Sequence, residues 1–240
     1  MKHTFAIYYK DVSQHTHNKS IVHITDSFII NRIVSVLRLK ISEEIVLFDG
    51  IIWNICEITH ITKKEVICSI KKQNYIKKER EITFFLPLVE RDYRDTMLYA
   101  CGAQQINIQW VKYDNCHVSY NLTKELDRCY RVIHSACEQA KQYVIPVIKP
   151  SVISFDEMLA YITKEKKNLL YFDEQGKNIT STFTTISQSI YLTCGPEAGY
   201  SEREKELFLQ SNYTIALSAG PFISRSCDII QFSSLVIRSF

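Results

Sequence analysis

Residues 191–201 read YLTCGPEAGYS and place a Gly-Pro-Glu-Ala-Gly motif directly after an apolar run. The run, residues 190–193, is apolar or β-branched and predicts a buried strand. We expect Gly195 and Gly199 to adopt backbone conformations closed to other residues. Because loops at the carboxyl ends of strands line the ligand crevice of open α/β sheets, the chemistry of this chain is expected here.

A helix start follows this loop at once. Ser201 and Glu204 have the spacing of a capping box, which predicts a helix over residues 202–210. The loop is therefore expected to be fixed at both ends, by a strand and by a capped helix.

A second Gly-Pro step follows the next predicted strand. Residues 213–218 read YTIALS and run into Ala219, Gly220 and Pro221. We expect the two Gly-Pro loops to meet in space, although an ordinary tight turn explains either one alone. The chain has neither G-x-G-x-x-G nor G-x-x-x-x-G-K, so a dinucleotide or nucleoside-triphosphate cradle is not supported.

The first third of the chain is expected to be mostly β-structure. A small β-barrel is the natural closure for this many short strands, and the lysine-rich residues 71–80 are expected to form a linker. The predicted strands are residues 4–8, 21–24, 45–48, 51–58 and 66–70, with one helix over residues 27–37.

The rest of the chain alternates strands with helices, which predicts an α/β fold with a parallel sheet covered by helices. The predicted strands are residues 82–88, 106–111, 168–172, 190–194 and 213–218; the helices run through Met97, over residues 124–142 and 202–210, and at the C-terminus. The expected buried stripes are Leu126, Tyr130, Ile133, Cys137 and Ala140 on the second of these helices, and Ile229, Phe232, Val236 and Phe240 on the last.

Composition narrows the class of protein. With 46% hydrophobic residues the chain can bury a substantial core. It has no run of 18 apolar residues and no signal-peptide pattern, so we expect a cytoplasmic protein without a membrane partner. The eight cysteines show no C-x-x-C spacing and are expected to be reduced core residues, so no metal is expected.

Charge is distributed unevenly along the chain. Residues 1–80 hold 13 Lys and Arg against 8 Asp and Glu, so they carry +5, whereas the whole chain carries +3. Lysines flank the strand at residues 66–70 and would present a basic stripe suited to phosphates. A solvated lysine-rich surface is the alternative interpretation.

Four stretches carry a family resemblance. LTCGPEAGYSEREKE and ALSAGPFISRS resemble the two ligand-binding loops of the SPOUT class of RNA methyltransferases. RIVSVLRLKISEEIVLFDG, from residue 32, and SACEQA, from residue 135 and followed by Ile145-Pro146, are similar to the signatures of one family in that class. The chain thus resembles, over nearly its whole length, the RsmE family of ribosomal small-subunit RNA uridine-N3 methyltransferases.

The resemblance implies a fold and an activity. The expected fold is a PUA-like RNA-binding β-barrel at residues 1–76 and a SPOUT methyltransferase domain with a trefoil knot at residues 77–240. The implied activity is S-adenosylmethionine-dependent methylation of N3 of a uridine in 16S ribosomal RNA, on the assembled small subunit. A homodimer formed through the C-terminal domain is implied as well.

The resemblance also implies roles for particular residues. Arg225 would stabilise negative charge on the uracil or grip a phosphate, unless it forms a helix salt bridge to Asp228. Cofactor-binding residues would be Leu192, Cys194, Gly195, Pro196, Glu197, Gly199, Leu217, Ser218, Gly220, Pro221 and Ile223. RNA-binding residues would be Arg32, Arg38, Lys63, Lys64, Lys71, Lys72 and Arg91.

Several positions depart from the family pattern, and other interpretations stay open because of them. A family relative that binds RNA or an assembling ribosomal subunit without methylating it is one, and an unrelated α/β enzyme with a nucleotide-like ligand is another. No side chain is an obvious proton acceptor. The departures are Lys141 and Gln142 after the helix motif, Phe222 and Cys227 after the second Gly-Pro, and the absence of a lysine and a glutamate near Met97 and Ala100.

Overall fold

A computed structural model describes residues 4–16, 20–77, 81–118, 121–178, 189–218, 220 and 225–238. The chain divides into two compact units. One contains Met1–Lys77 together with Cys137–Ile145, and the other contains Lys78–Ala136 and Pro146–Phe240. The sequence did not predict that Cys137–Ile145, which begins within a long helix, packs with the first unit.

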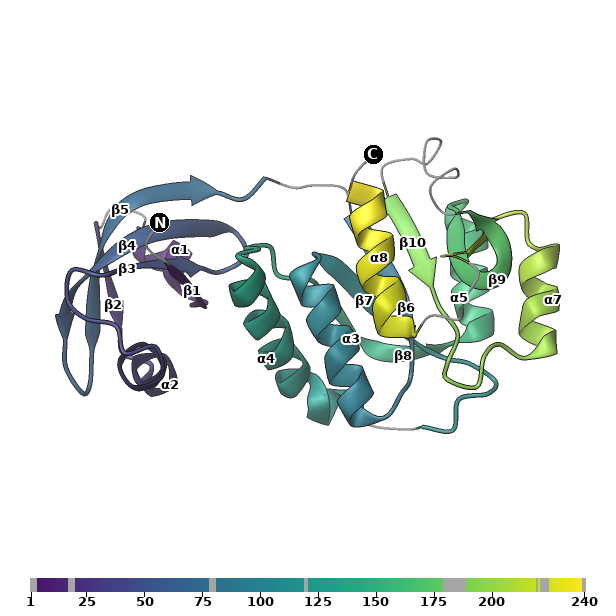
Figure 1. Ribbon diagram of the computed structural model, residues 1–240, viewed down its shortest axis with the longest axis horizontal. Coiled ribbons are helices and arrows are strands. Elements are labelled where there is room, and N and C mark those ends of the chain that lie inside the picture. Colours follow the sequence, from purple (N-terminus) through teal and green to yellow (C-terminus); the bar gives the residue numbers. More distant parts are fainter. Residues whose placement is uncertain are drawn as a thin grey trace. The chain divides into compact units, whose positions relative to one another are not determined.

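The first unit is built on a five-stranded sheet with the order β1-β3-β4-β5-β2. β1 pairs with β3 in parallel, and the other neighbours are antiparallel. Figure 1 shows β4 and β5 as long, curved neighbouring strands. The strands are β1 Phe5–Tyr8, β2 Ile21–Ile24, β3 Glu44–Phe48, β4 Ile52–Ile61 and β5 Val66–Tyr75, and a short helix that the sequence did not predict, α1, spans Val12–Thr16.

A helical segment packs against this sheet and closes its core. It begins as α2, Ser27–Asn31, and continues as a π-helical turn, η1, Arg32–Val36. Asp26 caps its start by accepting hydrogen bonds from the backbone of Phe28 and Ile29. The apolar face buries Ile30 and Ile33 in the same core as the strand residues.

The expected linker at residues 71–80 is wrong for its first half. β5 continues to Tyr75, which lies opposite Ile52 in the ladder with β4. Lys71 and Lys72 are exposed, so a charged sequence still forms a strand because its partner strand satisfies the backbone. Residues 78–80 lie outside the described part.

The second unit is built on a six-stranded sheet with the order β11-β9-β10-β6-β7-β8, and every described ladder in it is parallel. The predicted parallel sheet is confirmed. The strands are β6 Glu81–Pro87, β7 Ile106–Lys112, β8 Ile148–Ser154, β9 Leu169–Asn178, β10 Ser189–Thr193 and β11 Thr214–Ser218. The sequence did not predict β8, which reads IKPSVIS, mixes apolar with polar residues and is mostly exposed.

Helices cover both faces of this sheet. Figure 1 shows α3 and α8 side by side on one face, where they contact each other, with α5 and α7 across the sheet. The crossovers β6-α3-β7 and β7-α4-β8 run towards one edge of the sheet, and β10-α7-β11 runs towards the other. The helices are α3 Arg91–Ala103, α4 Leu122–Ala140, α5 Phe155–Glu165, which the sequence did not predict, α7 Glu202–Gln210 and α8 Ser226–Arg238.

The buried stripes of two helices differ from those expected. On α8, Ile230 and Ser233 are fully buried, while Phe232 is 39% exposed. Of the expected face, Ile229 is buried as predicted and Phe232 is not, and the last member, Phe240, lies outside the described residues. On α4, Ile133 and Cys137 are buried as predicted and Ala140 is exposed; the stripe is completed by Leu122, Cys129 and Ala136.

Candidate functional site

β10 ends in a buried hydroxyl that fixes where the first loop begins. Thr193 Oγ1 donates to the carbonyl of Phe85 at 2.8 Å and shares a short hydrogen bond with the Tyr113 hydroxyl. The next residue, Cys194, is 3% exposed, and burial raises the pKa of its thiol to about 12. Cys194 is thus protonated at neutral pH and does not act as a nucleophile.

The loop that follows is a tight turn. The Gly199 amide donates to the carbonyl of Pro196 at 2.8 Å. Gly199 has φ +73°, the left-handed region, and no atom lies within 4 Å of the position that a Cβ would take. Gly195 has no such φ, and a Cβ added there would make ordinary contacts at 3.5 Å. The expectation of an unusual backbone is therefore right for Gly199 and wrong for Gly195.

Side chains of other elements hold this loop. The predicted capping box of Ser201 and Glu204 is present. Glu204 is fully buried, and its carboxylate accepts the Ser201 amide at 2.8 Å and the amide of Asp114, in the loop after β7, at 2.7 Å. The Asn115 amide group donates to the carbonyl of Gly199 at 3.1 Å. The loop is therefore braced by the segment after β7 as well as by its own helix.

The second loop follows β11. Leu217 is buried, and the Ser218 hydroxyl donates to the carbonyl of Gly220 at 2.9 Å and accepts its amide at 3.2 Å. Gly220 has φ +141°, and the space beside it is open. The neighbouring residues Ala219 and 221–224, which include the predicted Pro221 and Ile223 and the departure at Phe222, lie outside the described residues.

A bulge in β9 forms a third wall. The β9–β11 ladder pairs Ala216 with Tyr171 and then Leu217 with Lys177, so residues 172–176 leave the register. The bulge returns through Gly176, where a Cβ would lie 2.4 Å from the carbonyl carbon of Leu217. Only glycine fits this close approach of two backbones.

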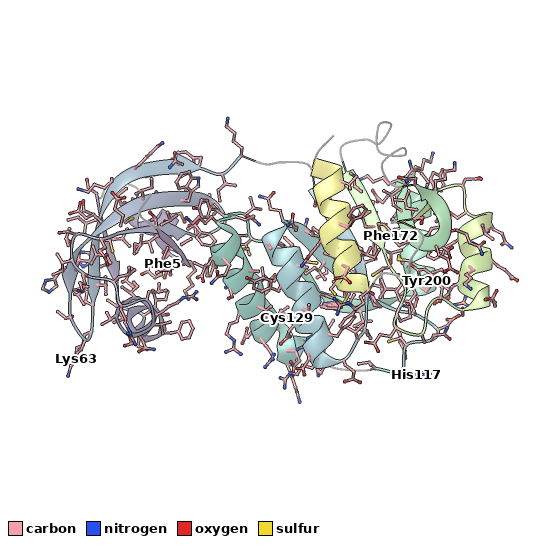
Figure 2. The ribbon with its side chains drawn as sticks, in the orientation of Figure 1. Phe5, Lys63, His117, Cys129, Phe172 and Tyr200 are labelled. Atoms are coloured by element: carbon pink, nitrogen blue, oxygen red, sulfur yellow. The ribbon has the colours of Figure 1, made fainter. Side chains whose placement is uncertain are left out.

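These three segments surround a cavity of about 580 Å³. Figure 2 labels Phe172 and Tyr200, which line it from the bulge and the first loop. The predicted meeting of the two Gly-Pro loops is thus confirmed for their described residues. The lining residues are Tyr93, Phe172, Asp173, Glu174, Cys194, Gly195, Pro196, Glu197, Ala198, Gly199, Tyr200, Lys205, Leu217, Ser218, Gly220, Arg225, Ser226 and Ile229.

Arg225 lies at the mouth of the cavity, immediately before α8. Its side chain is 73% exposed, and its Nε donates to Asp228 Oδ2 at 3.0 Å. This hydrogen bond lowers the pKa of Asp228. The salt bridge considered from the sequence is therefore present, and Arg225 also lines the cavity. The hydroxyl of Ser226, next in the chain, donates to the carbonyl of Gly195 at 3.3 Å and joins α8 to the first loop.

Most of the predicted cofactor residues line this cavity, and Leu192 does not, because it is buried inside β10. Sequence reasoning missed Tyr93, Lys205 and the acidic pair Asp173 and Glu174. The pair could have been found, since it directly follows a predicted strand, as the first loop does. Tyr93 and Lys205 carried no local signal.

Two of the predicted RNA-binding residues of the first unit have carboxylate partners. Arg32 pairs with Glu138, which also accepts the amide of Tyr8 at 2.8 Å. Burial raises the pKa of the Glu138 carboxyl, an effect that these two donors oppose. Lys71 pairs with Glu57 on the neighbouring strand at 2.8 Å.

The other predicted basic residues are exposed but do not form one cluster. Lys63 and Lys64 occupy the tip of the β4–β5 hairpin, and Figure 2 shows Lys63 projecting from it. Lys72 lies roughly 20 Å further along β5, by the rise of about 3.3 Å per strand residue. Arg38 is exposed as well. Arg91, in the second unit, pairs with Glu125 at 3.2 Å.

Structure explains several departures from the family pattern. Lys141 ends α4 with φ 52°, a left-handed conformation that glycine adopts at lower cost, so the loss of glycine there strains the backbone. Met97 and Ala100 are buried in α3, away from any charged role. Cys227 is also buried, and its thiol lies 3.9 Å from the Tyr93 hydroxyl. The side-chain amide of Gln142 donates to the backbone carbonyl of Val144 at 2.7 Å.

The described residues contain neither a candidate metal site nor a candidate membrane-spanning helix. No three His, Cys, Asp or Glu side chains in them converge well enough to hold a metal ion. None of their helices combines the length and apolar character needed to cross a bilayer.

Comparison with known proteins defines the class. The model of the RNA methyltransferase domain matches residues 77–225, and that of the RNA methyltransferase PUA domain matches residues 33–71. Because the first match covers more than half of the chain, this protein belongs to the RNA methyltransferase family that the domain defines.

Individual relatives narrow the resemblance. Ribosomal RNA small subunit methyltransferase E of Rickettsia conorii is 24% identical over 213 residues, which are 82% of this chain and 81% of the relative. The protein of that name from Neisseria gonorrhoeae, solved with S-adenosyl methionine, superimposes with a TM-score of 0.81 at 23% identity, covering 99% of this chain and 98% of that one. A Legionella pneumophila protein described as a methyltransferase, also solved with the cofactor, gives 0.82 at 19% identity, covering 99% and 98%.

These matches confirm the predicted resemblance to the RsmE family and the predicted architecture, a PUA-like unit followed by a SPOUT-type methyltransferase fold.

Proposed function

We propose that this protein transfers a methyl group from S-adenosylmethionine to N3 of a uridine in the RNA of the small ribosomal subunit. One observation carries the proposal: the cavity lies where the two glycine-containing loops of the methyltransferase domain meet. Relatives with the same fold are named for methylation of small-subunit ribosomal RNA or were solved with this cofactor.

The cavity fits such a cofactor in size and in shape. Its volume of about 580 Å³ is within the range of roughly 300–1,000 Å³ typical of small-molecule sites. Space beside Gly199 and Gly220 is open, so a ligand can approach both backbones closely. Residues Cys194–Gly199 and Leu217–Gly220 would hold the cofactor mainly through backbone groups, a mode that tolerates side-chain changes such as Ala198. Pro221 and Ile223 remain part of this proposed set.

The bound cofactor would supply a methyl group activated by the positive charge on sulfur. The uracil must lose its N3 proton to become a nucleophile, and a cation beside it stabilises the resulting anion. Arg225 is our candidate, because it is permanently charged and lines the cavity. Its pair with Asp228 is exposed to solvent and therefore weak, so exchange of that partner for the substrate costs little.

RNA would be bound by exposed basic side chains. Lys63, Lys64, Lys72 and Arg38 of the first unit are exposed. Lys71, Arg32 and Arg91 would contribute only by exchanging their present carboxylate partners. Neutralising Lys63 and Lys64 should weaken RNA binding and reduce its salt dependence.

Three further properties belong to the same proposal: a trefoil knot, a homodimer and a cytoplasmic location. The hydrogen bond between Ser226 and Gly195, which joins α8 to the first loop, supports the threading of the chain end. Tyr99 on α3 and Phe232 on α8 are 40% and 39% exposed, and these two helices pack together, which supports a partner surface there.

Calorimetric titration with S-adenosylmethionine tests the cofactor, and methyl transfer to purified small ribosomal subunits tests the reaction. We expect one site per chain and no binding by Gly195→Arg, whose side chain would fill the first loop. Arg225→Ala should lower methyl transfer about 100-fold or more with an unchanged melting temperature. A folded wild type that binds no cofactor would overturn the proposal. Cofactor binding without methyl transfer would instead contradict the proposed reaction and leave the cofactor site in place.

A further inference from the structure

Acidic side chains predominate among the charged residues of the cavity wall. Asp173, Glu174 and Glu197 line it against two cations, Lys205 and Arg225.

Each cation already has a carboxylate partner that does not line the cavity. Lys205 Nζ lies 2.9 Å from Glu202, and Arg225 pairs with Asp228 at 3.0 Å. Neither cation is therefore available to neutralise the wall in full.

The three lining carboxylates have no close ion partner, although Lys205 attracts Asp173 and Glu174 at longer range. Within the described residues, no Lys, Arg or His nitrogen lies within 4.0 Å of Asp173, Glu174 or Glu197. The sequence adds nothing to balance them, since residues 179–188 and 221–224 contain no charged side chain. The cavity wall is thus negative and complementary to a cationic ligand.

Two of these carboxylates are placed by the backbone. Asp173 and Glu174 are on the β9 bulge, which leaves the ladder after Tyr171 and rejoins it at Lys177. Asp173 Oδ1 accepts the Gln175 amide at 2.9 Å, and Gly176 holds the bulge against Leu217. Since Leu217 itself lines the cavity, the bulge and the second loop keep a fixed spacing.

We propose that the β9 bulge is a charge-selectivity element, in which Asp173 and Glu174 favour the cationic methyl donor over the demethylated product. The proposal rests on the proposed function. The donor carries a sulfonium, and the product, S-adenosylhomocysteine, differs by having a neutral thioether and no methyl group. A nearby carboxylate therefore distinguishes the two by charge, whereas loops that bind through backbone shape hold both alike.

Coulomb's law sets the size of the effect. Opposite unit charges 4 Å apart in water attract enough to change affinity about fivefold, and more where water is partly excluded. Two carboxylates at somewhat greater distances should together favour the donor by roughly tenfold. Loss of the charge on methyl transfer would weaken retention of the product and promote its exchange for fresh donor.

The test is calorimetric titration of the full chain with S-adenosylmethionine and, separately, with S-adenosylhomocysteine. Asp173→Asn/Glu174→Gln preserves shape and removes both charges. We expect its Kd for the donor to rise about tenfold and its Kd for the product to stay within twofold. Glu206→Gln, an exposed α7 carboxylate outside the cavity lining, is the matched control and should change neither. Raising salt should reduce donor preference only in the wild type and the control.

The outcomes separate this proposal from the one on which it rests. A wild type that binds neither ligand contradicts the proposed function, and selectivity fails with it. Suppose that the wild type binds both ligands. If the double variant then binds both equally more weakly, or binds both unchanged, the selectivity role alone is overturned. Each single variant is titrated too and its melting curve recorded, so misfolding of the double variant would not decide the result.

Discussion

The first loop and the β9 bulge face the same cavity but are held in place by different means. Hydrogen bonds from Asn115 and Ser226 fix the loop, and the buried Glu204 fixes the helix start behind it. The bulge is held by the contact of two backbones at Gly176. The loop thus gives the cavity its shape and contributes one carboxylate without a close ion partner, Glu197, whereas the bulge contributes two, Asp173 and Glu174.

The largest effect is expected at Gly176, where the two backbones touch. Gly176→Ala would place a Cβ 2.4 Å from the carbonyl carbon of Leu217, so the bulge or the second loop must move. Overpacking of this kind costs about 1–3 kcal/mol of unfolding free energy, and we expect the upper end together with loss of cofactor binding. Denaturant unfolding and calorimetry measure both. Gly195→Ala is the control, because its Cβ would make ordinary 3.5 Å contacts, and an equal loss there would remove the distinction.

A smaller loss is expected at the carboxylate behind the loop. Glu204→Ala leaves the buried amides of Ser201 and Asp114 without their acceptor and removes half of the capping box. We expect a loss of about 2 kcal/mol, in the range for charge-assisted hydrogen bonds. Thermal melting provides the measurement, with Glu206→Ala on the exposed side of α7 as the control. A loss no greater than that of the control would contradict the bracing role.

The left-handed turn residue should have a more moderate effect. Gly199→Ala has room for its Cβ but must hold φ at +73°, which costs about 1 kcal/mol. Gly199→Asn should cost less, because asparagine tolerates this region better. Chemical denaturation of the two variants separates backbone strain from steric contact. Equal losses would show that the conformation of the turn is not the cause.

The smallest effect is a pH dependence at the base of the loop. Hydrogen bonds from Arg203 and Ser201 lower the pKa of Asp114 below 3.8, its ordinary value. A carboxyl with a lowered folded-state pKa stabilises the protein above its unfolded pKa and loses that contribution as pH falls through the folded value. Asp114→Asn should therefore reduce the melting temperature slightly at pH 7, and the difference should shrink as pH falls below 3.8 and through the lowered folded-state pKa. Asp156→Asn, the other partner of Arg203, is the control; a pH-independent difference at Asp114 would refute the charge effect.

The sequence predicted those parts of the site that depend on contacts between residues close together in the chain, and it did not predict the parts that depend on distant contacts. The strand–loop–helix unit around Gly195, its capping box and the parallel sheet followed from apolar runs, glycines and cap residues. β8 was missed because its residues are largely exposed, and residues 71–75 were assigned to a linker because their charge obscured a strand. In both cases the residues form a strand because a neighbouring strand pairs with them. The sequence of one strand does not identify the strand with which it pairs.

The same limit applies to individual side chains. The pair of Arg225 with Asp228, three residues apart, could be named from the sequence, whereas the pair of Arg32 with Glu138 depends on which elements pack together. The dipeptide Asp173-Glu174 could be found at the end of a strand. That it has no close cationic partner is known only from the positions of the surrounding strands, helices and loops in the folded chain.

The sequence by itself determined the family, the two kinds of unit and the loop that begins at Cys194, because glycine, proline and capping residues act on their own backbone. Only the tertiary structure decided that β9 bulges at residues 172–176 and returns through Gly176 against Leu217. The reason is physical, because both features involve groups that are far apart in the sequence. The contact between the Gly176 and Leu217 backbones and the electrostatic field of the cavity wall arise only after the sheet has brought those groups together.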